Sequence, residues 1–197
     1  MQYIGREMIN LIKNQILESI EVKTNLLGSS LSDIEEAANI MITSIRNKGK
    51  ILWCGNCGSA ADAQHLSTEL MGGMSDHDRK PIPSISLVTD SSFLTAWAND
   101  TDFESIFSRQ VKGLGLSGDV LVGISTSGNS ENIVSAIKQA KFKELKTIVL
   151  TGEGSGKLEN IADVTINVPS KDTQRIQESH IMIGQIICGL IEKDLLK

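Results

Sequence analysis

The stretch Gly123-Ile-Ser-Thr-Ser-Gly-Asn-Ser130 decides the fold, because it joins an apolar run to a segment with helical spacing. The run that leads into it, Asp119–Ile124, has the composition of a buried strand. The segment after it, Glu131–Lys138, places apolar residues at helical intervals. A strand that passes through a short turn into a helix is the building unit of α/β proteins.

Hydroxyl groups fill this turn. Ser125, Thr126, Ser127 and Ser130 supply four of them, and Gly128 lets the backbone come close to a ligand. Backbone N–H groups and the positive end of the helix dipole point to the same place, which suits a phosphate group. The stretch therefore predicts a phosphate site. The alternative interpretation is a Ser/Thr-rich loop that only caps the helix, since these residue types are common there.

Length and composition limit the other possibilities. The 197 residues suffice for one well-filled core, and 40% of them are hydrophobic while only 4% are aromatic. The net charge of −5 argues against broad nucleic-acid binding, which needs clustered Lys and Arg. No apolar run approaches the roughly 20 residues of a membrane span, and the N-terminus lacks a signal-peptide pattern. We expect a cytoplasmic protein with neither a membrane segment nor a direct nucleic-acid partner.

Short apolar runs alternate with amphipathic stretches over most of the chain, which predicts a parallel sheet covered by helices on both faces. The predicted strands are Ile51–Cys54, Ser84–Val88, Val120–Ile124, Thr147–Leu150 and Val164–Val168. The predicted helices between and after them are Ser59–Met71, Ser91–Ala98, Phe103–Gly113, Asn132–Lys141 and the long closing helix Asp172–Leu196. With no linker or repeat, residues 1–197 are predicted to form a single domain.

Helical spacing also covers Asn10 to about Arg46, with a break predicted at Gly28–Ser30. The first of these helices and the closing helix both carry wide apolar faces. Either both helices simply cover the sheet, or they join copies of the chain. We favour a homo-oligomer in which residues 1–48 contribute contacts and residues 49–197 form the sheet core and the closing helix.

A second polar loop, Cys54-Gly-Asn-Cys-Gly-Ser-Ala-Ala-Asp62, follows the first predicted strand. It places Asn56 and Ser59 at the carboxyl end of a strand, where open parallel sheets bind ligands. The loop has neither the G-x-G-x-x-G spacing of dinucleotide sites nor the Gly-Lys-Ser/Thr of a P-loop, so we expect no nucleotide cofactor. Cys54 and Cys57 have the spacing of redox or zinc pairs, but no second pair exists and Cys54 ends an apolar strand, which disfavours both roles.

Candidate acid–base residues follow this loop. His65 and Glu69 are four residues apart and share one face of the predicted helix. Such a pair can bind a metal, transfer protons or form a surface ion pair. In the closing helix, Gln177 and Glu178 interrupt an apolar run, and they either reach the ligand or face solvent.

Together these segments resemble the sugar isomerase (SIS) domain, and more closely the phosphoheptose isomerase family. The longest matching motif is Gly55-Asn-Cys-Gly-Ser-Ala-Ala-Asp-Ala-Gln-His65, with Glu69 four residues later. Shorter matches are Val88-Thr-Asp90, Ala98-Asn-Asp100, Phe107-Ser-Arg-Gln110, Ile124-Ser-Thr-Ser-Gly-Asn-Ser130 and Arg175-Ile-Gln-Glu178. The resemblance spans nearly the whole chain.

The resemblance implies a three-layer αβα sandwich with a five-stranded parallel sheet and an N-terminal helical extension. It also implies a homotetramer with active sites at subunit boundaries. The implied reaction converts sedoheptulose 7-phosphate to D-glycero-D-manno-heptose 7-phosphate, a precursor of bacterial surface heptoses. A ketose–aldose isomerase of this kind moves a proton between adjacent carbons through an enediol(ate).

The resemblance further implies roles for individual residues. The phosphate would be held by Gly58, Ser59, Ser125, Thr126, Ser127 and Ser130. The sugar would be contacted by Asn56, Asp90 and Gln177. Proton transfer would involve Glu69 and the residue at 185, with His65 nearby. Some members of the family bind zinc, and the matching positions are His65, Glu69, Gln177 and Gln185.

Two positions depart from the family pattern. The family has a partner acid–base histidine, also a metal ligand, where this chain has Gln185. A glutamine amide does not exchange protons near pH 7, although its oxygen can coordinate a metal. His180 lies roughly 140° away around the helix, so we do not expect it to replace that histidine. Either Glu69 performs both transfers, or a metal-bound water assisted by His65 contributes.

The second departure is Cys57, which replaces a loop glycine of the family. If this position needs a positive φ, the Cβ atom of a cysteine adds roughly 1–2 kcal/mol of strain. The loop that positions Asn56 and Ser59 is then altered in shape.

The missing histidine leaves alternatives open. The DnaA initiator-associating protein, a non-enzymatic relative, lacks it too, so a DnaA-binding role is one of them. A sugar-phosphate sensor that binds without turnover is another. Asp62 and Glu69 stand where the isomerases have them and where the initiator-associating relatives differ, and for this reason we favour the isomerase.

Overall fold

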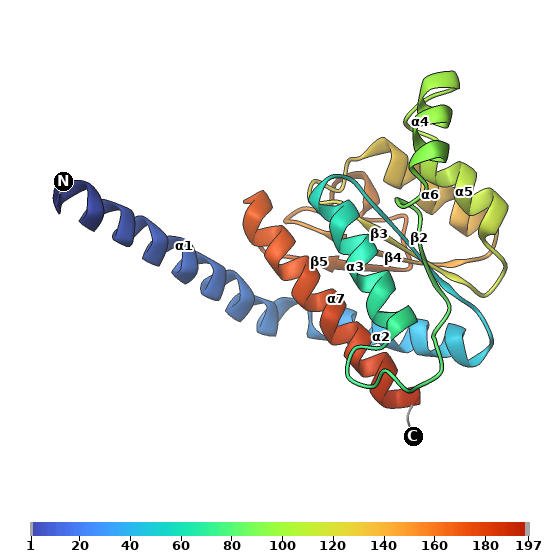
Figure 1. Ribbon diagram of the computed structural model, residues 1–197, viewed down its shortest axis with the longest axis horizontal. Coiled ribbons are helices and arrows are strands. Elements are labelled where there is room, and N and C mark those ends of the chain that lie inside the picture. Colours follow the sequence, from blue (N-terminus) through green and yellow to red (C-terminus); the bar gives the residue numbers. More distant parts are fainter. Residues whose placement is uncertain (1, 196–197) are drawn as a thin grey trace.

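A five-stranded parallel sheet forms the centre of the computed structural model, which describes residues 2–195, with side chains from residue 7 onward. The strand order is β2-β1-β3-β4-β5 (Figure 1). The strands are β1 (Ile51–Gly55), β2 (Ser84–Ser86), β3 (Val120–Ile124), β4 (Lys146–Thr151) and β5 (Val164–Asn167). The predicted parallel sheet is confirmed, and the predicted strands differ from the observed ones only at their ends.

The central strands are apolar throughout because the sheet is covered on both faces. All five residues of β1 and all five of β3 are buried. Successive side chains alternate between two cores: Ile51 and Trp53 pack into one, and Leu52 and Cys54 into the other. Each core is closed by helices that place their own apolar stripe against the sheet.

The helices are α1 (Gln2–Ser29), α2 (Leu31–Arg46), α3 (Gly58–Gly72), α4 (Ser91–Asp100), α5 (Ile106–Leu114), α6 (Glu131–Phe142) and α7 (Thr173–Leu195). Helices α2, α3 and α7 share one core, and α5 and α6 share the other, which confirms the three-layer sandwich. Of the predicted closing helix, Leu196 lies outside the described residues. Helix α4 stands out from the body and buries none of its residues (Figure 1).

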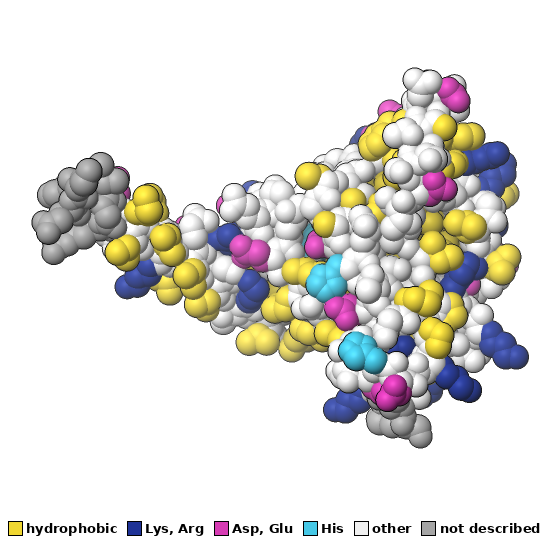
Figure 2. Space-filling model, in the orientation of Figure 1, with side chains coloured by type: hydrophobic (Ala, Val, Ile, Leu, Met, Phe, Trp, Pro, Cys, Tyr) yellow, Lys and Arg dark blue, Asp and Glu magenta, His cyan; other side chains and the backbone are white. Residues whose placement is uncertain are grey.

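Helix α1 does not cover the sheet. It projects from the body as a long arm (Figure 1), and hydrophobic side chains lie along it (Figure 2). Eight of those described are at least half exposed, namely Met8, Ile9, Leu11, Ile12, Ile16, Leu17, Ile20 and Leu27. The interpretation in which both terminal helices cover the sheet is thus wrong for α1, whereas α7 buries Ile183, Ile187 and Ile191 against it.

Polar contacts hold the second half of α1 to the body. Arg175 at the start of α7 donates to the backbone oxygen of Gln15 at 2.8 Å, and Ser19 donates to the Glu178 carboxylate at 2.7 Å. Ser30, between α1 and α2, donates to the backbone oxygen of Asn167 at 2.8 Å. In the described part of the chain, none of the helices has the length and apolar character needed to cross a bilayer.

Candidate active site

Two loops leave the sheet side by side. Strands β1 and β3 are neighbours, and Gly55 pairs with Ile124 at their carboxyl ends. The loop after β1 leads into α3, and the loop after β3 leads into α6, so the N-termini of both helices lie at this edge. Their unpaired N–H groups and dipoles favour an anion there.

The loop after β3 is shaped by Gly128. Its φ is +65°, and an added Cβ atom would lie 1.8 Å from the backbone oxygen of Ser155, so only glycine fits. The Ser125 and Ser130 hydroxyls approach each other to 3.1 Å. Ser130 occupies the N-cap position of α6, yet its side chain makes no capping hydrogen bond. The structure thus gives no support to the interpretation of this loop as only a cap, and it leaves these hydroxyls near a common point.

An amide pair ties the two loops together. Asn56 Nδ2 donates to Asn132 Oδ1 at 2.9 Å, and Asn132 Nδ2 donates to Asn56 Oδ1 at 2.9 Å. Asn132 is only 3% exposed. Asn132 was not among the site residues predicted from the sequence. A polar residue among the buried positions of α6 could have indicated that its amide has a partner inside the protein. Asn56 therefore holds the loops in register, and each amide keeps further hydrogen-bonding capacity for a ligand.

Cys57 lies in the turn that starts α3. It has φ 52° and ψ −118°, a conformation that favours glycine. The position therefore does need a positive φ, and the Cβ atom of Cys57 strains the backbone there. Its thiol is exposed, whereas Cys54 is buried and burial raises the pKa of the Cys54 thiol. A buried, protonated thiol is unreactive, which weighs further against a redox pair.

Gln177 reaches this same loop. An added Cβ atom at Gly58 would lie 2.5 Å from Gln177 Nε2, so the absence of a side chain at 58 makes room for this amide. Ser59, one residue later, is buried with 3% exposure. The Gln177 side chain therefore packs on Gly58 at the first turn of α3, the turn that also carries Ser59.

The remaining predicted site residues are Thr126 and Ser127, in the loop after β3, and Asp90, at the start of α4. Thr126 and Ser127 line a hollow of about 180 Å³ together with Lys171, Thr173 and other residues near the start of α7. Asp90 is exposed after β2 and accepts a hydrogen bond from Phe93 N at 2.9 Å, which caps α4. A larger hollow of about 650 Å³ lies between α2 and the loop at 116–119, and none of the predicted site residues lines it.

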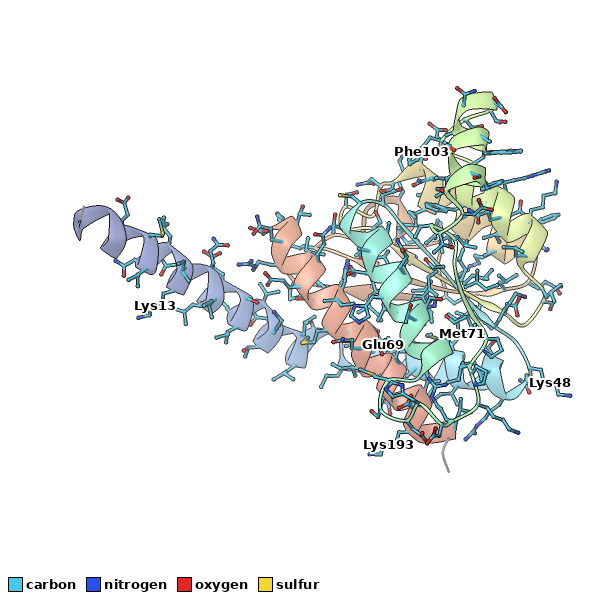
Figure 3. All side chains as sticks on the ribbon, viewed as in Figure 1. Lys13, Lys48, Glu69, Met71, Phe103 and Lys193 are labelled. Carbon is cyan, nitrogen blue, oxygen red and sulfur yellow. The ribbon has the colours of Figure 1, made fainter. Side chains whose placement is uncertain are left out.

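The acid–base candidates lie further along α3. His65 Nε2 is 2.8 Å from Glu69 Oε1, and the Glu69 side chain is the more shielded of the two, at 19% exposed against 46%. Figure 3 shows Glu69 on α3, which packs alongside α7. An added Cβ atom at Gly184 would lie 2.3 Å from Leu66, so the next residue, Gln185, lies at the level of His65 and Glu69.

Asp62 lies one turn before His65 on α3. Burial raises the pKa of the Asp62 carboxyl to about 6, against an opposing effect of His65. Its Oδ2 atom is buried and has no hydrogen-bond partner among the described residues. This carboxyl thus has a pKa raised toward neutral pH, and it lies beside the His65–Glu69 pair.

His180 is an interior residue and does not replace the missing histidine. It is fully buried, and its Nε2 is 3.1 Å from the backbone oxygen of Thr151. Burial lowers the pKa of His180 to about 4, so the ring is neutral at pH 7 and donates to that oxygen. The prediction that His180 lies on a different side of α7 from Gln185 is confirmed.

The four residues implied as zinc ligands do not converge within one chain. His65 and Glu69 are adjacent, but Gln177 packs against Gly58, about 16 Å along the α3 axis from Glu69. Over the described residues, no group of three or more His, Cys, Asp or Glu side chains is arranged to hold a metal ion. A single chain therefore does not supply the complete donor set.

Comparisons with known proteins identify the family of this chain. The model of the SIS domain matches residues 16–152. The phosphoheptose isomerase of Sulfurimonas denitrificans is 47% identical over 186 residues, which cover 93% of this chain and 95% of that protein. This chain belongs to the SIS domain family, and within it to the phosphoheptose isomerases.

Solved structures of this family superpose closely on the chain. The phosphoheptose isomerase of Neisseria gonorrhoeae matches with a TM-score of 0.89 and 41% identity, over 94% of this chain and 99% of that one. The phosphoheptose isomerase of Francisella tularensis matches with a TM-score of 0.91 and 37% identity, over 94% and 98%. The family and fold expected from the motifs are confirmed.

Replacing Cys57 by glycine is expected to stabilise the protein by about 1 kcal/mol, because glycine adopts φ 52° without a Cβ clash. Chemical denaturation measures the change. Cys57→Ala is the matched control, since it removes the thiol but keeps the Cβ atom. Equal stabilisation by both variants would show that the backbone conformation is not the cause.

Asn132→Asp is expected to weaken binding of a sugar phosphate about tenfold, because aspartate cannot donate to Asn56 Oδ1 and adds a negative charge beside the phosphate loop. Isothermal titration calorimetry gives the affinity. Asn39→Asp, at an exposed position on α2, introduces the same charge away from the loops. If both variants lose affinity equally, the amide pair has no specific role.

Proposed function

We propose that this phosphoheptose isomerase converts sedoheptulose 7-phosphate to D-glycero-D-manno-heptose 7-phosphate, an early step toward bacterial surface heptoses. The observation that carries the proposal is the pairing of an anion-binding edge, built by the loops after β1 and β3, with the His65–Glu69 pair on the helix that begins in one of them. The isomerases that it resembles over nearly their whole length support the same reaction.

The phosphate is bound at the N-termini of α3 and α6. Ser59, Ser125 and Ser130 donate hydroxyl groups, and Gly58 and Gly128 bring the backbone close. Thr126 and Ser127 line the adjacent hollow. The sugar then extends past Gln177 and Asn56, whose amides bind hydroxyl groups.

Glu69 carries the proton between the two carbons. Its carboxylate removes the proton from C1 of the ketose, and the same group returns it to C2 of the enediol(ate). His65, 2.8 Å away, fixes one carboxylate oxygen and leaves the other directed to the substrate. A single base suffices for this step because both carbons are reached from one face of the planar intermediate.

Gln185 supplies a hydrogen-bond donor where the family has a histidine. Its amide N–H stabilises the oxygen that becomes negative in the enediolate, but it does not hand over a proton. The hydroxyl proton then moves between the neighbouring oxygens of the intermediate itself. This chain therefore retains the electrostatic part of that residue's role and loses the proton-transfer part.

A second copy of the chain completes the site. The phosphate loops and Glu69 are about 16 Å apart along α3, a distance that one heptose phosphate does not span easily within a single subunit. The exposed apolar face of α1 requires a partner, and a homotetramer built through it supports a site shared between subunits. The zinc ion of the family would likewise need residues from two chains, and we route no step through it.

Neither alternative gains support. Nothing in the fold or the relatives favours capture of DnaA, and the adjacent His65–Glu69 pair gives a chemical role that a binding protein or a sensor does not need.

Glu69→Gln is expected to lower turnover of sedoheptulose 7-phosphate at least 10³-fold while binding persists, because the amide cannot accept the proton. Gln185→His is expected to raise kcat, since imidazole restores an acid–base group near pH 7. Steady-state kinetics and calorimetry separate turnover from binding. Wild-type binding without turnover would favour the sensor, and an active Glu69→Gln variant would exclude Glu69 as the base.

Mixed oligomers test the shared site. Glu69→Gln and the double variant Ser125→Ala/Ser130→Ala are each expected to be inactive. In oligomers assembled from an equal mixture, about a quarter of the sites combine an intact phosphate loop from one chain with an intact Glu69 from another, so the mixture recovers about a quarter of wild-type activity. Sedimentation of differently tagged chains verifies mixing, and self-mixed samples serve as controls. Mixed oligomers without activity would place the whole site within one chain.

A further inference from the structure

A buried ion pair lies outside the residues assigned to the reaction. Arg79, in the loop after α3, donates from Nε to Glu192 Oε2 of α7 at 2.6 Å. The side chains are 5% and 3% exposed. Glu192 also accepts hydrogen bonds from three backbone N–H groups, those of Met74, Ser75 and Asp76, at 2.8, 2.7 and 3.2 Å. The carboxylate is thus fully satisfied, which is the condition under which a buried charge is tolerated.

The second arm of the guanidinium reaches α3. Arg79 Nη2 donates to the backbone oxygen of Glu69 at 2.8 Å, and Nη1 donates to the backbone oxygen of Lys80 at 3.0 Å. The carbonyl of Glu69 is one of the last in the helix and also accepts from Gly73 N at 3.2 Å. Arg79 therefore binds the main chain of the residue that carries the proton.

The other partner of the pair belongs to the helix that carries Gln185. Glu192 lies seven residues after Gln185, so the two share one face of α7. Between them, Cys188 Sγ lies 3.8 Å from the backbone oxygen of Leu66, and Gly184, just before Gln185, packs on the Leu66 side chain. Helices α3 and α7 thus pack side by side along this α3–α7 contact. Arg79 bridges the two helices near their C-terminal ends.

We propose that Arg79 and Glu192 are positioning residues that set the separation of Glu69 and Gln185. The planar fork of an arginine can hold a carboxylate on one helix and a carbonyl on the other at the same time, which a lysine ammonium does not reproduce. Because the hydrogen bonds and the Arg79 charge lower the pKa of Glu192 to about 2, the pair keeps its charge across the working pH range. The inference rests on the proposed role of Glu69.

The test compares Arg79→Lys with the wild type. Lysine keeps the charge beside Glu192 but loses the simultaneous contact with the Glu69 oxygen. We expect kcat for sedoheptulose 7-phosphate to fall about 10–100-fold, since a displacement of about 1 Å has effects of this size. KM is expected to change less than about twofold, because the phosphate loops lie at the other end of α3. Glu192→Gln is expected to act in the same direction.

Asp119→Asn is the matched control. Asp119 is another buried carboxylate, paired with Lys50 and bonded to two backbone N–H groups at the amino ends of β1 and β3. The Asp119→Asn variant is expected to have a lower free energy of unfolding, as Arg79→Lys has, while its kcat stays unchanged. A fall in kcat that follows stability equally in both variants would overturn the inference.

A second measurement does not depend on turnover. The ring ¹⁵N shifts of His65, which hydrogen-bonds to Glu69, are expected to change in Arg79→Lys and to stay as in the wild type in Asp119→Asn. Unchanged His65 shifts in Arg79→Lys would overturn the inference, whether or not the wild-type enzyme is active. A wild type without turnover would instead refute the proposed function.

Discussion

Parallel pairing of β1 with β3, in the register that sets Gly55 opposite Ile124, is the constraint on which the site depends. It brings two strand-to-helix turns to the same edge and so aligns the N-termini of α3 and α6. The alignment needs a lateral tie, because each loop alone is short and polar. The reciprocal amide bonds between Asn56 and Asn132 provide it at the point where the loops diverge.

Helix α3 links two chemically different regions. Its first turn presents the backbone N–H groups of the proposed phosphate site, and its third and fourth turns carry His65 and Glu69. A straight helix keeps these regions at a fixed distance, which a flexible loop would not do. The contact between α3 and α7 then sets how close the residues of α7 come to Glu69. The two helices can approach here because Gly184 has no side chain to collide with Leu66. In the proposed mechanism, Gln185 changes the proton transfer and leaves this frame as it is.

Much of this architecture could be predicted from the sequence, because it follows from local patterns. Apolar runs marked the strands, and small hydroxyl residues after β3 marked the loop proposed to bind phosphate. Contacts between distant segments could not be predicted. Arg79 meets Glu192 across 113 residues, and Asn56 meets Asn132 across 76, so no periodicity connects them. The amphipathic pattern of α1 likewise showed an apolar face but not whether the sheet or another chain would cover it.

The projecting helix α1 has a thermodynamic consequence. Its apolar side chains contribute free energy only when another surface removes them from water, so in the proposed oligomer part of the folding energy of each chain is released on association. Stability then obeys mass action, and the melting temperature rises with protein concentration. Because Arg175 and Glu178 hold α1 against the start of α7, dilution of the proposed oligomer is expected to loosen first the turn that carries Gln177.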